Sequence, residues 1–90
     1  MTLKEFADFI GTKLRVDYYH DQNQRMSASL EYVDIIDGQF SISASGGSTG
    51  LKPEKAIENF VKEIRGKEIR LRRHDGRRDD YYKVPNDLTA

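Results

Sequence analysis

The sequence contains no cysteine and no tryptophan, and only two of its 90 residues are proline. Without cysteine the chain has no disulfides, no thiolate zinc site and no thiol nucleophile, which suits a reducing compartment such as the cytoplasm. No apolar run approaches the ~18 residues that a membrane span requires. Residues 1–10 include acidic residues and lack an apolar signal core, so we do not expect a secretion signal there.

The chain also lacks a net charge, because 15 Lys and Arg residues balance 15 Asp and Glu residues. This balance argues against electrostatic binding of nucleic acid through the overall charge of the protein. The distribution is uneven, however, since residues 65–78 hold seven Lys and Arg residues against two acids. Such a patch can attract phosphate locally. The length predicts one small domain over residues 1–90.

Two segments have the period of an amphipathic helix. Residues 2–10 open with the capping box "TLKE", and their apolar residues recur at helical spacing: Leu3, Phe6, Phe9 and Ile10. A second helix is predicted from Pro53, which suits the first helical position, to a stop at Gly66. Its apolar stripe consists of Ala56, Ile57, Phe60, Val61 and Ile64. We expect both stripes to face one core.

Alternation of apolar and polar residues predicts strands at 12–20, 26–36 and 40–45. The alternation slips after Tyr32, which indicates a bulge near 32–34. The dipeptide Asp37-Gly38 between apolar runs predicts a hairpin. The glycine-rich segment that follows lacks the Gly-Lys-Ser/Thr of a phosphate-binding loop, so we expect a flexible crossover to the second helix. The predicted inward residues are Leu14, Val16, Leu30, Phe40, Ile42, Ile69 and Leu71.

The segment "EIRLRRHDGRRDDYYKVP" predicts a second hairpin. A four-residue loop over 75–78 pairs Leu71 with Tyr82 and collects the apolar residues on one face, whereas a two-residue turn pairs Leu71 with Asp80. The first register is therefore expected. It sends these side chains to the other face: Arg70, Arg72, Tyr81 and Lys83. Residues 85–90 are expected to be a frayed tail.

The predicted order is therefore α-β-β-β-α-β-β. Strands that alternate, rather than running continuously apolar, favour antiparallel pairing with one wet face. The sequence thus predicts an α+β fold, a two-layer sandwich with an antiparallel sheet and both helices on one face.

The basic hairpin at 65–78 is the main candidate for binding. Arginine can hold phosphate in a bidentate manner, and an exposed tyrosine can stack on a base or anchor a protein interface. The candidate binding residues are Arg70, Arg72, Arg77, Arg78, Tyr81 and Tyr19. Three interpretations stay open at this point: a solvated edge neutralised by neighbouring acids, a nucleic-acid contact, and a contact with an acidic protein surface.

No arrangement in the sequence predicts catalysis. The two histidines, His20 and His74, fall in predicted turns, and each is followed by an aspartate that cannot easily orient it. No three or four residues have the spacing of a metal site. We therefore expect a protein that is not an enzyme and that has no cofactor and no metal.

Two families have a similar order of elements. A helix, three strands, a glycine-bearing loop and a second helix resemble the double-stranded-RNA-binding domain. That family carries a Lys-Lys-x-x-Lys cluster at the last helix, whereas "LKPEKAIENF" here offers only Lys52 and Lys55, and the terminal hairpin is extra. The same segment also resembles the opening of the helix in HicB-type antitoxins.

A further resemblance covers residues 45–85. The run "SGGSTGLKPEKAIENFVKEIRGKEIRL", with the charged hairpin and "KVP" after it, resembles small proteins of phages and prophages of Gram-positive bacteria. The resemblance implies a cytoplasmic, non-catalytic accessory protein that acts on a host protein, such as a component of a defence system. The alternative is a nucleic-acid-binding module that uses the basic hairpin. Neither hypothesis requires a membrane.

Overall fold

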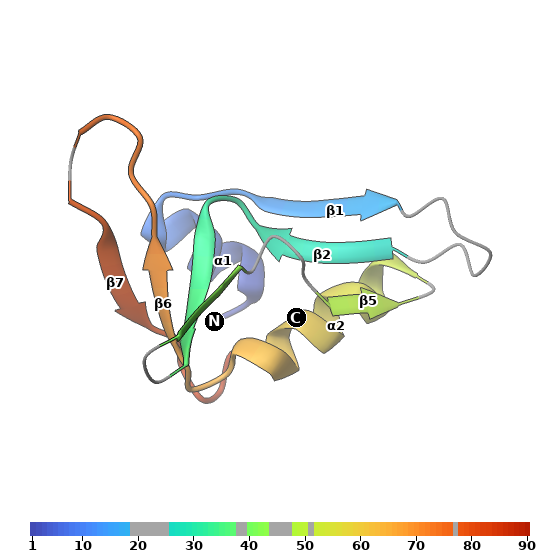
Figure 1. The fold of residues 1–90 in the computed structure, drawn as a ribbon. Helices are drawn as coiled ribbons and strands as arrows, with labels where there is room; N and C mark the ends of the chain where they lie inside the picture. Colours follow the sequence, from blue (N-terminus) through green and yellow to red (C-terminus); the bar gives the residue numbers. More distant parts are fainter. Residues whose placement is uncertain (19–25, 38–39, 44–47, 51, 77) are drawn as a thin grey trace.

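The structure is a computed structural model that describes residues 1–18, 26–37, 40–43, 48–50, 52–76 and 78–90. These residues form two helices and seven strands, whose arrangement can be followed in Figure 1. In chain order these are α1 (Leu3–Ile10), β1 (Leu14–Tyr18), β2 (Met26–Leu30), β3 (Val33–Asp37), β4 (Phe40–Ser43), β5 (Ser48–Gly50), α2 (Pro53–Ile64), β6 (Glu68–Leu71) and β7 (Asp80–Lys83).

The predicted capping box begins α1. The Thr2 hydroxyl accepts a hydrogen bond from the Glu5 backbone N–H at 3.2 Å, and the Glu5 carboxylate accepts one from the Thr2 N–H at 2.9 Å. These bonds, led by the one from the Thr2 backbone, lower the pKa of Glu5. Gly11 ends the helix in the left-handed region at φ 83°, as expected for a glycine at this position. Pro53 begins α2, also as predicted.

All strand pairs are antiparallel, but they form two sheets rather than one. One sheet has the order β1-β2-β5, and the other has the order β4-β3-β6-β7. The predicted strand over 26–36 is divided at Glu31 and Tyr32, where Tyr32 has a φ of 60°. This left-handed residue turns the chain from one sheet into the other, close to the predicted bulge (Figure 1).

The glycine-rich segment was expected to be a crossover without regular structure, and that expectation is wrong for part of it. Residues Ser48–Gly50 form β5, which pairs with β2 and places Met26 opposite Gly50. Backbone hydrogen bonding to an existing strand edge is enough to form such a short strand, and side-chain alternation does not reveal it.

The second hairpin has a different register from the predicted one. Leu71 lies opposite Asp80 and Ile69 lies opposite Tyr82, a shift of two residues. The shift leaves each side chain on its expected face, because side chains alternate with a period of two. Residues 72–79 connect the strands. This longer loop is held together by hydrogen bonds from Arg73 to Asp79 and Asp80, which the apolar pattern does not show.

The apolar faces of both helices pack against both sheets in one core. Phe60 is 1% exposed and lies at its centre, as predicted. The predictions that Phe9 and Val16 face the core are wrong, because Phe9 is 70% exposed and Val16 is 36% exposed. Phe9 lies at the margin of the helix stripe, and Val16 lies on an edge strand that the helices cover only in part. The predicted core residues Phe40 and Ile42 lie on β4, of which the structure describes the backbone and not the side chains.

The C-terminal residues are not a frayed tail. Leu88 is fully buried in the core. The Leu3 N–H donates to the Thr89 carbonyl at 2.8 Å, and the Thr89 N–H donates to the Met1 carbonyl at 3.0 Å. Arg65 Nε donates to the Leu88 carbonyl at 2.7 Å. Residues 88 and 89 therefore close the core beneath α1. One apolar residue in a polar pentapeptide was too weak a signal to predict this.

Candidate functional site

The fold places three of the predicted binding residues on one face of the four-stranded sheet. Arg70 lies on β6 between the buried Ile69 and Leu71, and Arg72 directly follows the strand, so both side chains lie on the face away from the core. Tyr81 lies opposite Arg70 on β7 and is 58% exposed, as predicted. Among the other candidates, Arg78 is exposed in the loop before β7, whereas Tyr19 and Arg77 lie outside the described residues.

Asp34 organises this face. It lies opposite Arg70 in the β3–β6 pairing, and its side chain is only 7% exposed. Its Oδ2 atom accepts a hydrogen bond from Arg70 Nη2 at 2.8 Å and lies 3.3 Å from Arg72 Nε. The hydrogen bond to Asp34 raises the pKa of Arg70 above its ordinary value. A buried carboxylate requires such partners. Its hydrogen bond holds Arg70, whereas Arg72 Nε forms an ion pair with it and makes no hydrogen bond within the described part of the chain.

The next arginine is engaged by acids at the start of β7. Arg73 Nε donates to Asp80 Oδ2 at 2.9 Å, and the Arg73 backbone N–H donates to Asp79 Oδ1 at 3.0 Å. Asp79 Oδ2 also lies 3.8 Å from Arg70 Nε. Each arginine of the segment 70–73 therefore faces an aspartate. The fold neutralises much of the positive patch that the sequence shows.

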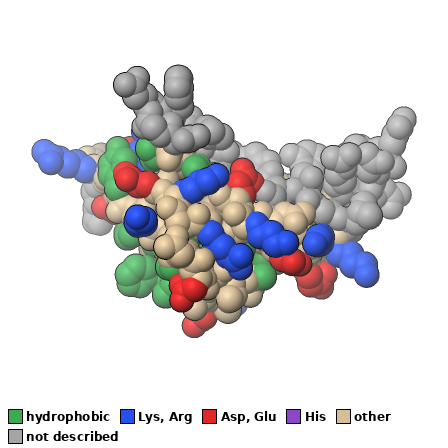
Figure 2. Space-filling model, turned by 90° about the horizontal axis from the view of Figure 1, so that it is seen from below, with side chains coloured by type: hydrophobic (Ala, Val, Ile, Leu, Met, Phe, Trp, Pro, Cys, Tyr) green, Lys and Arg blue, Asp and Glu red, His purple; other side chains and the backbone are tan. Residues whose placement is uncertain are grey.

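The helical side of the molecule carries mixed charge as well. Figure 2 shows Lys and Arg side chains with Asp and Glu side chains among them, over the face seen from below. On α2, Lys55 and Lys62 lie 3.9 Å and 3.6 Å from the carboxylate of Glu58. This arrangement is typical of a solvated helix surface, and it offers no field of one sign to a polyanion.

Tyr32 is a residue that sequence reasoning did not select. Its side chain is 46% exposed. Its backbone φ of 60° is rare for a residue with a bulky side chain, and glycine or asparagine would adopt this angle at a lower energetic cost. Its ring packs edge-on against His74, with the ring centroids 4.3 Å apart. Its carbonyl accepts a hydrogen bond from the Arg72 N–H at 2.9 Å. The slip in alternation after Tyr32 was the only signal in the sequence.

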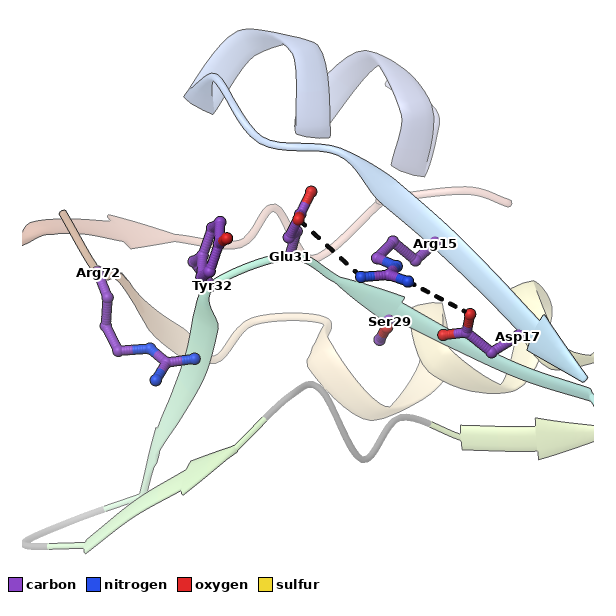
Figure 3. A pocket seen from close by; sticks show the side chains of 6 residues that line it. All are labelled: Arg15, Asp17, Ser29, Glu31, Tyr32 and Arg72. Atoms are coloured by element: carbon purple, nitrogen blue, oxygen red, sulfur yellow. Dashed lines mark ion pairs between the residues drawn. The ribbon is translucent and has the colours of Figure 1, made fainter. Parts of the chain in front are cut away.

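Tyr32 and Arg72 line two neighbouring hollows. The first has a volume of about 290 Å³, and Figure 3 shows its other lining residues on β1 and on β2 with its C-terminal end: Arg15, Asp17, Ser29 and Glu31. The second, of about 360 Å³, is also lined by Gly11, Thr12 and His74. Tyr32 and Arg72 thus belong to both hollows. We call the surface of Tyr32, Arg70, Arg72 and Tyr81 around Asp34 the Tyr–Arg face.

The described part of the chain contains no group of three or more His, Asp or Glu side chains placed to hold a metal ion. Within the same residues, no helix is long and apolar enough to cross a membrane. His74 packs on Tyr32, and His20 lies outside the described residues.

Replacing Asp34 by asparagine tests the role assigned to this carboxylate. The Asp34→Asn protein is expected to lose about 1–3 kcal/mol of unfolding free energy, because a charge-assisted hydrogen bond is lost in a buried position. Two arginines are also released from their counter-charge, so any weak binding to DNA at low salt should increase. Urea unfolding and a DNA titration measure the two effects. Unchanged stability would show that Asp34 does not hold this face together.

Comparison with protein-family models, with curated proteins and with solved structures finds no significant match to this chain.

Proposed function

We propose that this chain is a non-catalytic binding protein whose target is another protein, and that the Tyr–Arg face is its contact surface. The observation that carries the proposal is the buried Asp34, which accepts a hydrogen bond from Arg70 and forms an ion pair with Arg72, with the exposed Tyr32 and Tyr81 nearby. Tyrosine and arginine are the residue types that dominate the energy of protein interfaces. Side chains that are already ordered lose less entropy on binding, which favours affinity.

Nucleic-acid binding by the hairpin at 65–78 is the competing function. Proteins that bind DNA through phosphate contacts typically make about 6–10 of them. Arg70, Arg72 and Arg73 each have a carboxylate within 3.3 Å, so a phosphate would have to compete with an internal partner. This competition supports the protein target over the nucleic acid.

The resemblance of residues 45–85 to phage and prophage proteins makes a protein of the host cell the proposed target, and the host cytoplasm the proposed location. A component of a host defence system belongs to the same proposal. The absence of cysteine is compatible with that compartment.

A pair of variants separates the target classes. Tyr32→Gly removes the ring while a glycine accepts the positive φ, so the fold should be retained. Immobilised wild-type protein is expected to capture one host protein from nuclease-treated lysate in a stoichiometric amount. The Tyr32→Gly and Arg72→Ala variants should each capture much less of that host protein. Lys62→Ala is the control, because it removes an exposed cation from α2, outside the Tyr–Arg face.

Titration with labelled single- and double-stranded DNA and RNA completes the experiment. We expect no binding that survives moderate salt. Tight binding that weakens steeply with salt, and that Arg70→Ala and Arg72→Ala abolish, would replace the protein target by a nucleic acid. Equal capture by all variants would remove the Tyr–Arg face from the proposal.

A further inference from the structure

Strand β1 forms one edge of the three-stranded sheet, and its outer side has no neighbouring strand among the described residues. Figure 1 shows β1 along the top of the molecule with β2 on one side. The strand is regular over five residues and contains neither a proline nor a bulge, the devices that commonly protect an edge. Such an edge is a template for a further strand.

The hydrogen bonding of β1 shows which backbone groups face outward. The Glu31 N–H donates to the Lys13 carbonyl at 3.0 Å, so residues 13 and 31 form a hydrogen-bonded pair. In an antiparallel ladder such pairs alternate with non-hydrogen-bonded ones. Arg15 therefore bonds toward Ser29, whereas the N–H and carbonyl groups of Leu14 and Val16 point to the outer side of the strand.

The side chains of β1 are self-complementary when a second copy runs antiparallel about Val16. This register places Arg15 of one copy opposite Asp17 of the other, on both sides of the two-fold axis. These two residues fall in non-hydrogen-bonded pairs, where opposing Cα atoms are closest, about 4.5 Å apart. The outward backbone groups of Val16 then bond to their own counterparts.

Neighbouring registers are unfavourable. A shift by two residues in one direction places Arg15 opposite Arg15, and a shift in the other places Asp17 opposite Asp17. A shift of one residue moves every side chain to the wrong face and mismatches the backbone donors. The charges thus select one arrangement out of those that the edge allows.

The exposure of β1 agrees with an added strand. Val16 lies opposite the buried Ala28 in the β1–β2 pairing and is 36% exposed at the edge of the sheet, where a neighbouring strand would cover part of it. The Arg15 and Asp17 side chains are 56% and 58% exposed, and they lie 3.7 Å apart within one chain, beyond hydrogen-bond length. Arg15 also lies 4.0 Å from the Glu31 carboxylate. Exposed ion pairs of this length contribute little to one copy, so contacts with a second copy can replace them.

We propose that this protein forms a two-fold symmetric dimer in which the β1 strands of two copies pair antiparallel, centred on Val16. The two three-stranded sheets then become one continuous sheet, and the interface is isologous. A contact of this length is smaller than the about 1,200 Å² of a stable interface, so the dissociation constant should be about 10⁻⁵–10⁻³ M.

Sedimentation equilibrium from micromolar to millimolar concentration measures the dimer. Val16→Pro removes an N–H that points away from β2, so the β1–β2 ladder stays intact, and proline is tolerated at such edge positions. We expect this variant to remain monomeric. A wild-type protein that is monomeric at millimolar concentration, or a dimer that Val16→Pro leaves unchanged, would overturn the proposal.

Charge exchange supplies a second and independent readout. Arg15→Asp alone and Asp17→Arg alone each create like-charged pairs, and each should weaken the dimer about tenfold or more. An equimolar mixture of these two variants should form a heterodimer, and the double variant Arg15→Asp/Asp17→Arg should recover wild-type affinity. Failure of both the mixture and the double variant to associate excludes this register. Tyr32→Gly leaves the edge unchanged, so this result is independent of the Tyr–Arg face.

Discussion

Phe60→Ala is expected to lower the free energy of unfolding by about 3–5 kcal/mol. The Phe60 side chain is 1% exposed in the core, on α2, which packs on β2 and β5 of the three-stranded sheet. Removing it leaves a cavity into which the surrounding structure relaxes only in part. The total stability expected for a domain of this size is about 5–13 kcal/mol, so this one substitution removes a large part of it. Urea unfolding followed by circular dichroism measures the loss.

Phe9→Ala is the matched control, since it makes the same chemical change on α1 at a side chain that is 70% exposed. Phe9 contacts only the edge of the Tyr82 ring among the aromatic residues described, with centroids 6.4 Å apart. Its loss should therefore change the unfolding free energy by less than about 1 kcal/mol. Equal effects of the two substitutions would contradict the placement of the core.

Leu88→Ala is expected to lower the free energy of unfolding by about 2–5 kcal/mol, which is the second largest effect. A fully buried leucine contributes through apolar area and through the cavity its removal leaves. The loss should also loosen the hydrogen bond from the Leu3 N–H to the Thr89 carbonyl. Hydrogen exchange at the Leu3 amide should therefore accelerate in the variant, alongside a lower urea midpoint.

Asp87→Ala controls for this experiment, because Asp87 is the exposed neighbour in the same segment. Its effect should stay within about 0.5 kcal/mol, as for other exposed positions. If Leu88→Ala behaved like Asp87→Ala, residues 85–90 would be the frayed tail that the sequence pattern predicts.

Local patterns predicted the elements of this fold well, whereas contacts between distant residues were hidden from them. The capping box at Thr2 and the proline at Pro53 mark helix starts because capping depends on neighbours three or four residues away. The pairing of β5 with β2 and the burial of Leu88 depend on segments far apart in the chain. Neither leaves a periodic trace in the sequence.

The same division applies to the candidate site. Alternation correctly placed Arg70, Arg72 and Tyr81 on one face of the second hairpin. The partner that decides their chemistry is Asp34, which lies 36 residues from Arg70 in the chain and reaches it through the β3–β6 pairing. Without knowledge of that pairing, the sequence of the hairpin predicts a basic patch. Tyr32 escaped notice because backbone strain at one residue has no compositional signature.

The contact of Leu3 with the carbonyl of Thr89, and the burial of Leu88 in the core that α1 covers, have a consequence for biosynthesis. A ribosome makes residues 88 and 89 some 85 residues after the start of α1. At ~5–20 residues per second, the apolar face of α1 therefore waits for several seconds before these partners exist. During that time the core cannot close around α1, and its apolar face is open to chaperones.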